Sequence, residues 1–223
     1  MNWLAEPQQG YWLSERAKKR SAFSHTRCGE NLVPGAQCPN CRKPLLCILA
    51  LDSRDPRVDV SGCPLESLPL LFCWTCNVAQ DRFFYQLHSG GVSLLRYKKG
   101  GVTDDFPYCS YPDHFPQSPL DLTPVTQEDQ EMIRRLNAGE DLWLTNERAE
   151  ELQVPDHQVG GEPILVSGDD RLKCVVCKRI SPFFASVGDN AGHNLSFTEN
   201  EFVQTLFFLC RRCWVVGAVQ QSD

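Results

Sequence analysis

The sequence lacks a long hydrophobic run. Its longest apolar stretches, such as Leu206–Leu209, fall far short of the roughly 18 residues that suggest a membrane span. Residues 1–20 carry their basic residues after the apolar ones and include no apolar segment typical of a signal peptide. We therefore expect a soluble, cytoplasmic protein with no membrane partner.

Positive charge is also scarce. The 223 residues hold 22 lysines and arginines against 28 aspartates and glutamates, which gives a formal net charge of −6. Nucleic-acid binding draws its affinity from Lys and Arg against phosphate, so an acidic chain is a poor default candidate. The alternative of a nucleic-acid-binding or ribosome-binding zinc ribbon rests on short basic stretches and nearby aromatic residues. These are Arg16–Arg20, Arg42-Lys43, Lys178-Arg179, Arg211-Arg212, Phe23, Trp74 and Trp214.

Familiar catalytic motifs are missing as well. The chain contains no H-E-x-x-H, no H-x-E paired with P-C-x-x-C, and no G-x-x-x-x-G-K phosphate loop. The histidines are scattered, at His25, His88, His114, His157 and His193. We therefore expect no catalytic residues and no enzymatic activity.

Cysteine, by contrast, is abundant. Disulfides are disfavoured in a reducing cytosol, so clustered cysteines there indicate a metal site or catalysis. Eight of the twelve cysteines form four C-x-x-C pairs, at Cys38/Cys41, Cys73/Cys76, Cys174/Cys177 and Cys210/Cys213.

The four pairs belong to a repeated unit. The first two pairs are separated by 31 residues and the last two by 32, so the unit recurs at an offset of 136–137 residues. A basic dipeptide follows the first pair of each half, and an apolar run leads into the second pair. Such a period predicts a duplicated architecture.

Tetrahedral coordination explains the pairing. Two thiolates on one C-x-x-C turn bind one Zn²⁺, and a second turn supplies the other two. Each half therefore predicts one closed Cys₄ site, with two structural Zn²⁺ per chain. A rubredoxin-like iron site, redox-active C-x-x-C pairs and pairing across the halves are the alternatives.

The remaining cysteines have separate interpretations. Cys47 lies in an apolar run and is expected to be a buried small hydrophobe. Cys28 and Cys63 are candidates for a spare ligand, and Cys109 is assigned no role. His157 and His193 flank the second quartet and are expected to be packed or loop residues, not ligands.

Strand-like segments dominate the rest of the chain. Period and composition predict strands at Pro44–Leu51, Leu68–Phe72, Arg82–Leu87, Val92–Tyr97, Pro163–Ser167, Phe183–Val187 and Thr205–Leu209. We expect a β-rich (α+β) fold of two pseudo-repeated β-sheet halves. The first repeat is assigned to residues 1–112, a proline-rich connector with helices to 113–155, and the second repeat to 156–223.

The connector predicts little regular structure before its helices. Five prolines within residues 104–124 argue against a strand or helix there. A helix is expected to follow, with Thr123 as N-cap, Pro124 at N1 and Gly139 at C′. A short second helix is predicted over Asn146–Leu152. The acidic residues early in the first helix are expected to form a solvated face.

One segment resembles a known family. Residues 157–177, with Gly160, Gly161 and Pro163 before an apolar run and Cys174-x-x-Cys177, resemble the opening of the C-terminal half of the YwqG-like bacterial family. The arrangement is also similar to the eukaryotic programmed cell death protein 2 family. That resemblance implies a pseudo-twofold β-sheet protein with zinc knuckles at strand ends and, for the eukaryotic branch, the escort of a ribosomal protein. The first half departs from the pattern, because Cys28-Gly29 stands where Gly-Gly is expected.

Three functions are compatible with these features. Closed metal sites and an acidic surface favour a protein-interaction or client-escort module, because an acidic surface complements a basic client. A nucleic-acid-binding zinc ribbon and a toxin-neutralising, immunity-type binding protein are the alternatives. A protein partner is expected in the first case and a nucleic acid in the second.

Overall fold

A computed structural model describes residues 9–15, 21–76, 78, 82–100, 112–144, 146–152, 157–168, 171–188 and 203–222. Strands predominate in them. The strands of the first half and the connector are β1 (Tyr11–Glu15), β2 (His25–Arg27), β3 (Leu46–Asp52), β4 (Ser67–Phe72), β5 (Phe83–His88), β6 (Gly91–Arg96) and β7 (Ser118–Pro124). The later strands are β8 (Gln158–Val159), β9 (Leu172–Lys173), β10 (Ile180–Ser181), β11 (Phe183–Gly188), β12 (Val203–Cys210) and β13 (Val215–Ser222).

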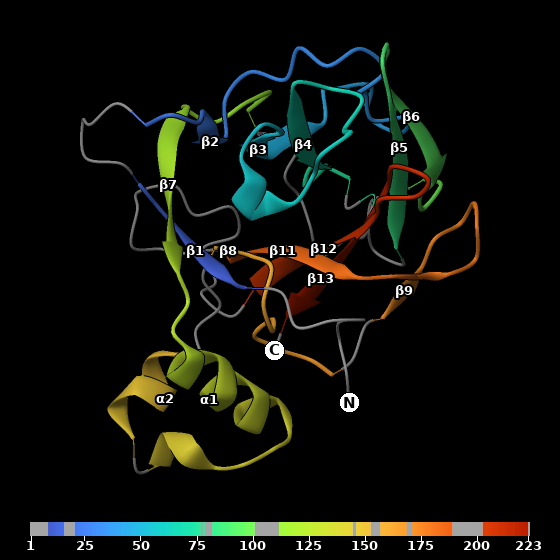
Figure 1. Cartoon of the computed structure of the whole chain (residues 1–223). Helices are drawn as coiled ribbons and strands as arrows, with labels where there is room; N and C mark the ends of the chain where they lie inside the picture. The colour runs from blue at the N-terminus through green and yellow to red at the C-terminus, as the bar shows by residue number, and fades with distance from the viewer. Residues whose placement is uncertain are drawn as a thin grey trace.

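Eleven of the described strands form one antiparallel sheet. Its order is β4-β3-β2-β7-β1-β8-β11-β12-β13-β5-β6, while β9 and β10 pair separately. The sheet curls strongly. As a result β4, at one edge of the sheet, lies near β5, which is next to the other edge strand, β6 (Figure 1). The largest core cluster contains Phe72, Phe83 and Phe207, and a second one contains Phe183 and Phe208. The two expected halves thus share a single sheet.

Eight of the eleven strands are ordered symmetrically about the β7–β1 pair. Outward from this central pair, β2, β3 and β4 follow on one side and β8, β11 and β12 on the other, while β13, β5 and β6 have no counterpart. The strands also cross between the parts of the chain: β1, from the first repeat, pairs with β8 of the second, and β7, from the connector, pairs with β2 of the first. Leu13 pairs with Leu122 in the middle of the central pair. Neither half can be removed without exposing a strand edge of the other.

The backbone that follows β2 matches the backbone that follows β8. Cys28 and Gly29 have φ of 55° and 108°, and Gly160 and Gly161 have φ of 66° and 70°. The N–H of Cys28 donates to the carbonyl of Ile48 at 2.9 Å, as the N–H of Gly160 donates to Phe184 at 2.8 Å. Cys28-Gly29 therefore takes the left-handed conformation of the Gly-Gly pair despite the difference in sequence.

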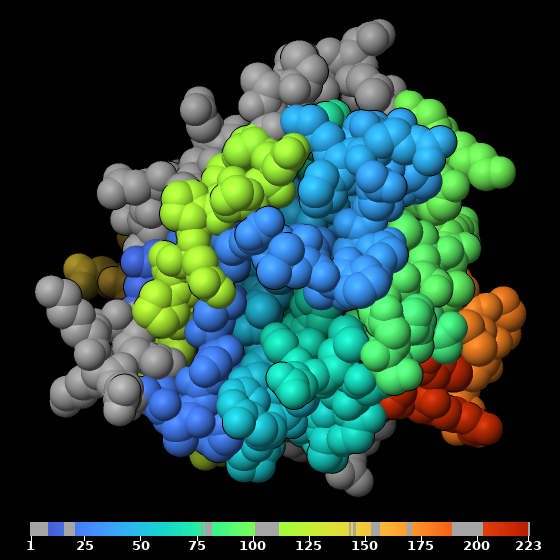
Figure 2. Space-filling view, turned by 90° about the horizontal axis from the view of Figure 1, so that it is seen from above, coloured from blue at the N-terminus to red at the C-terminus, as the bar shows by residue number. Residues whose placement is uncertain are grey.

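The β6 edge of the sheet is partly covered. Figure 2 shows the segment before β3, in blue, lying against the green β5–β6 hairpin. The N–H of Val92 donates to the carbonyl of Pro34 at 2.9 Å. A Cβ at Gly35 would stand 2.1 Å from the oxygen of Val92, and one at Gly91 would stand 2.2 Å from the oxygen of Pro34. The two glycines permit this close approach, which protects an edge strand from other partners.

Tyr85 joins the two strands that the curl brings together. Its hydroxyl donates to the carbonyl of Pro69 at 2.7 Å and accepts from the N–H of Leu71 at 3.0 Å, both on β4. Tyr85 is fully buried, and burial raises the pKa of its phenol well above the ordinary value. The hydroxyl therefore takes the place of a neighbouring strand along the β4 edge.

Tyr85→Phe is expected to destabilise the protein by about 1–3 kcal/mol, because it leaves a buried N–H and a buried carbonyl without their partner. Denaturant unfolding would measure the loss. Tyr11→Phe, at a partly exposed tyrosine, is the control and should change stability by less than about 0.5 kcal/mol. Equal stability of the Tyr85 variant and the wild type would contradict this role.

Most expected strands are confirmed to within two or three residues, and three differences stand out. Residues 163–167, expected as a strand, have no regular structure. Residues 118–124, expected to be irregular, form β7 in spite of Pro119 and Pro124. The strands expected at Arg82–Leu87 and Val92–Tyr97 leave a loop of four residues, but the loop of the β5–β6 hairpin is two residues long, because His88 pairs with Gly91. Residues 104–111, with Cys109, lie outside the described part of the chain.

The two expected helices are present, and the first begins later than predicted. α1 (Gln127–Asn137) is capped by Thr126, whose hydroxyl accepts from the N–H of Asp129, so Thr123 and Pro124 belong to β7. Gly139 has the expected left-handed conformation. A 3₁₀ turn, η3 (Leu142–Leu144), leads to α2 (Glu147–Glu151). Figure 1 shows the helices together below the sheet. None of the helices described is long and apolar enough to cross a membrane.

Candidate metal centres

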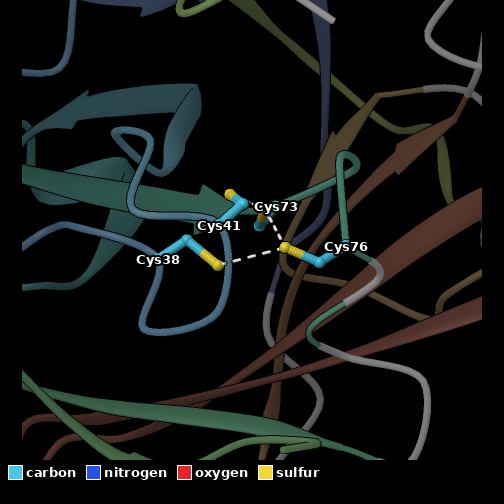
Figure 3. Close-up of side chains that lie close together, drawn as sticks. All are labelled: Cys38, Cys41, Cys73 and Cys76. Carbon is cyan, nitrogen blue, oxygen red and sulfur yellow. Dashed lines mark hydrogen bonds between the residues drawn. The ribbon is translucent and has the colours of Figure 1, made fainter. Parts of the chain in front are cut away.

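The first four cysteines meet at one point. Centre 1 consists of Cys38 and Cys41, before β3, and Cys73 and Cys76, after β4. Figure 3 shows the four side chains directed toward one another. The Sγ atoms of Cys38 and Cys76 are 3.4 Å apart, those of Cys73 and Cys76 3.6 Å, and those of Cys41 and Cys73 3.8 Å. Because β3 and β4 are antiparallel neighbours, the end of one lies beside the beginning of the other.

The last four cysteines form an equivalent group. Centre 2 consists of Cys174, Cys177, Cys210 and Cys213, whose sulfurs all lie within 4.8 Å of one another. The Sγ atoms of Cys177 and Cys210 are 3.6 Å apart. β11 and β12 hold this group as β3 and β4 hold centre 1. The pairing within each half is thereby confirmed, and pairing across the halves is excluded.

The first turn of each centre has the same backbone. In centre 1 the N–H of Cys38 donates to the carbonyl of Lys43 at 2.8 Å, and the N–H of Arg42, whose φ is 69°, donates to Cys38 at 3.0 Å. In centre 2 the equivalent bonds, 136 residues later, measure 2.8 and 2.9 Å, with a φ of 64° at Lys178. The tight turn directs both thiols of a pair to the same side.

The sulfur positions fit tetrahedral zinc. Four ligands at about 2.3 Å from a central ion place neighbouring sulfurs about 3.8 Å apart. The separations of 3.4–3.8 Å measured within centre 1 lie at or slightly below this value. Four thiolates complete the coordination shell, so each centre fits one structural Zn²⁺, two per chain.

The electrostatics of each centre favour one thiolate even without metal. The thiol of Cys73 donates to Cys38 and lowers the pKa of Cys38 to about 5, and two backbone N–H groups act in the same direction against the effect of burial. In centre 2 the backbone N–H of Arg179 lowers the pKa of Cys177 to about 7. Burial raises the pKa of Cys76 and of Cys210 to about 12. Zinc binding would displace the protons that remain on these thiols.

Acidification is expected to release zinc from centre 2 before centre 1. Protons compete with the metal for thiolates, so a ligand that water can reach is protonated more readily than a buried one. Centre 2 is the more open of the two, with two partly exposed ligands, Cys177 and Cys213, against Cys41 alone in centre 1.

A chromogenic chelator would follow zinc release as the pH is lowered. Two steps of one equivalent each are expected, and Cys177→Ser should abolish the step at higher pH. Release of both equivalents in a single step would contradict the order.

The other candidate ligands lie outside these centres. Neither four-cysteine group includes Cys28 or Cys63, so the spare-ligand hypothesis is not supported. Cys47 is buried as expected, and burial raises the pKa of its thiol to about 12. His157 is buried and belongs to neither centre, while His193 is beyond the described residues.

A buried polar cluster at the end of β3 away from centre 1 escaped the sequence analysis. Nε2 of His25 lies 2.8 Å from Asp55, and its Nδ1 accepts from the N–H of Asp52 at 3.2 Å. Arg57 donates to Asp55 through Nη2 at 2.6 Å. Burial acts to raise the pKa of Asp55, but the hydrogen bonds from Arg57 and His25 lower it below its ordinary value. With both ring nitrogens engaged, His25 is a structural residue.

No protein-family model, curated protein or solved structure matches this chain.

Proposed function

We propose that the protein is a cytosolic protein-interaction or client-escort module whose two zinc centres hold the sheet together. The similarity of the duplicated arrangement to the programmed cell death protein 2 family supports an escort role. The completed Cys₄ shells agree with it, because they leave zinc no open position for substrate or water. A toxin-neutralising protein would use the same design, so the partner's chemistry distinguishes the two.

The distribution of charge carries the proposal. Residues 127–152 contain eight acidic and three basic residues, so this helical segment holds a net charge of −5 out of −6 for the chain. Its arginines are already paired, Arg134 with Glu131, Arg135 with Glu140, and Arg148 with Asp129 and Glu151. Asp129 is buried and paired, which corrects the expectation that the early acidic residues are all solvated. The other acidic side chains are exposed and suited to a basic client.

Charge reversal in this segment tests the proposal. Asp141→Lys with Glu150→Lys, at two exposed positions outside the ion pairs described, is expected to weaken capture of a basic protein partner at least about tenfold. The tagged protein would be purified from its own cells and treated with nuclease, and the stoichiometric partner identified. Glu30→Lys with Glu66→Lys makes the same change of charge on exposed positions of the sheet and is the control. Equal capture by both variants would refute the proposal.

Nucleic-acid binding is the second candidate, favoured by the surface of centre 2. Lys173, Lys178, Arg179 and Arg212 are exposed around it. The aromatic platform expected for bases is reduced, however, because Trp74 is only 2% exposed and packs on Phe72 at 4.5 Å between ring centroids. Binding that falls steeply with salt and is lost with Lys178→Glu and Arg179→Glu would favour this candidate.

A further inference from the structure

A cleft lies at the boundary between the two halves of the sheet. Its volume is about 260 Å³, room for about nine water-sized groups. Residues 56–59 of the β3–β4 connection line it from the first half, and Val159, Gly160 and Phe184 line it from the second. Arg211, from the centre 2 turn between Cys210 and Cys213, also lines it. Ligand sites are common at such boundaries between structural units.

Two guanidinium groups line this cleft. Arg211 lies over the ring of Phe184, 5.9 Å from its centroid, and donates through Nε to the carbonyl of Asp59 at 2.7 Å. Its side chain is 27% exposed. Arg57 donates through Nη2 to Asp55 at 2.6 Å. Its Nη1 donates to the carbonyl of Leu122 at the longer distance of 3.4 Å. Each arginine is therefore fixed in place with donor capacity left over.

The charge balance limits the class of ligand. The carboxylate of Asp59 is 3.4 Å from Nη2 of Arg211 and that of Asp55 is 2.6 Å from Nη2 of Arg57, so two carboxylates balance the charges of the two arginines. These carboxylates repel a ligand with one negative charge less than they repel a doubly charged phosphate. Guanidinium groups match the planar geometry of a carboxylate. The remaining lining includes Pro56, Val58, Val159 and Phe184, which suits an apolar body.

We propose that this cleft binds a small monocarboxylate of about ten non-hydrogen atoms. The carboxylate accepts hydrogen bonds from Arg57 and Arg211. The apolar part of the ligand packs against the apolar residues of the lining. A free organic acid and the C-terminal carboxylate of a peptide share this chemistry. The site is separate from the acidic helical segment and from the coordination shells of both zinc centres.

Calorimetric titration of the zinc-loaded full-length protein with benzoate tests the proposal. Saturable binding at one site is expected, with at least about tenfold weaker binding of benzamide, which has the same shape without the charge. Arg211→Gln should weaken benzoate binding by a similar factor. Arg212→Gln, in the same turn but outside the cleft, is the matched control and should bind as the wild type does. A capped dipeptide with a free C-terminal carboxylate, compared with its amide, separates the two sources.

Several results would overturn the proposal. They are the absence of saturable binding by either carboxylate, equal affinity for benzoate and benzamide, and undiminished binding by Arg211→Gln. Tighter binding of inorganic phosphate than of benzoate would overturn the carboxylate class. Arg57→Lys provides a second variant that keeps the charge opposite Asp55. It should weaken benzoate binding, because lysine lacks the planar pair of donors.

Discussion

Cys38→Ser is expected to reduce the zinc content from two equivalents to one and to destabilise the protein by about 4 kcal/mol or more. A structural zinc site contributes about 10–16 kcal/mol of apparent binding free energy in small domains, and much of that energy supports the fold. Cys38 is fully buried, and its sulfur lies 3.4 Å from that of Cys76. Serine provides no thiolate to bind the zinc. For a chain of this size the loss corresponds to a melting temperature lower by about 8–16 °C.

Metal analysis and thermal unfolding would test this expectation together. Cys63→Ser is the matched control, because Cys63 is a partly exposed thiol in the same half and in neither centre. It should keep two zinc equivalents and change stability by less than about 1 kcal/mol. A Cys38→Ser protein with one zinc and wild-type stability would show that centre 1 does not support the fold.

The loosened region should be the half that loses its metal. Hydrogen exchange is expected to speed up in β3 and β4 for Cys38→Ser, and in β11 and β12 for Cys174→Ser. Faster hydrogen exchange is also expected in the central β7–β1 pair of both variants, because β7 pairs with β2 and β1 with β8. Equal protection of both halves in each variant would contradict this division.

The metal centres were predictable because their information is local. A C-x-x-C turn places two thiols on one side whatever the rest of the chain does, and the interval of 31–32 residues accommodates two antiparallel strands. The long buried strands were predictable for a similar reason, since β3, β4, β11 and β12 are nearly continuous apolar runs.

The exchange of strands at the centre was not predictable. β2 has three residues and β8 has two, too few for any periodicity, and their partners are far away in the sequence. β7 contains Pro119 and Pro124, which argue against a strand when only local rules are applied. The sequence did not reveal that the Cys28-Gly29 turn matches Gly160-Gly161, because the two turns share a backbone conformation but begin with different residues. In each case a tertiary contact determines the structure.

Asp55→Ala is expected to cost about 1–3 kcal/mol, because it leaves the buried Nε2–H of His25 without its acceptor. The carboxylate of Asp55 is fully buried and receives hydrogen bonds from Arg57 and from the ring of His25. It also caps the 3₁₀ turn at Pro56–Val58 by accepting from the backbone N–H of Arg57. Since Nδ1 of His25 accepts from Asp52, the proton on Nε2 has no other described partner once Asp55 is removed.

The neighbouring Asp52–Arg54 pair provides the comparison. Arg54→Ala removes a side chain that is 72% exposed, and the buried carboxylate of Asp52 keeps the backbone N–H groups of Ser24 and Arg54 as donors, so the loss should be clearly smaller than that of Asp55→Ala. Denaturant unfolding at neutral pH, where both zinc ions are retained, measures the two variants side by side. A loss for Asp55→Ala no larger than that for Arg54→Ala would mean that His25 and Arg57 find water or other partners.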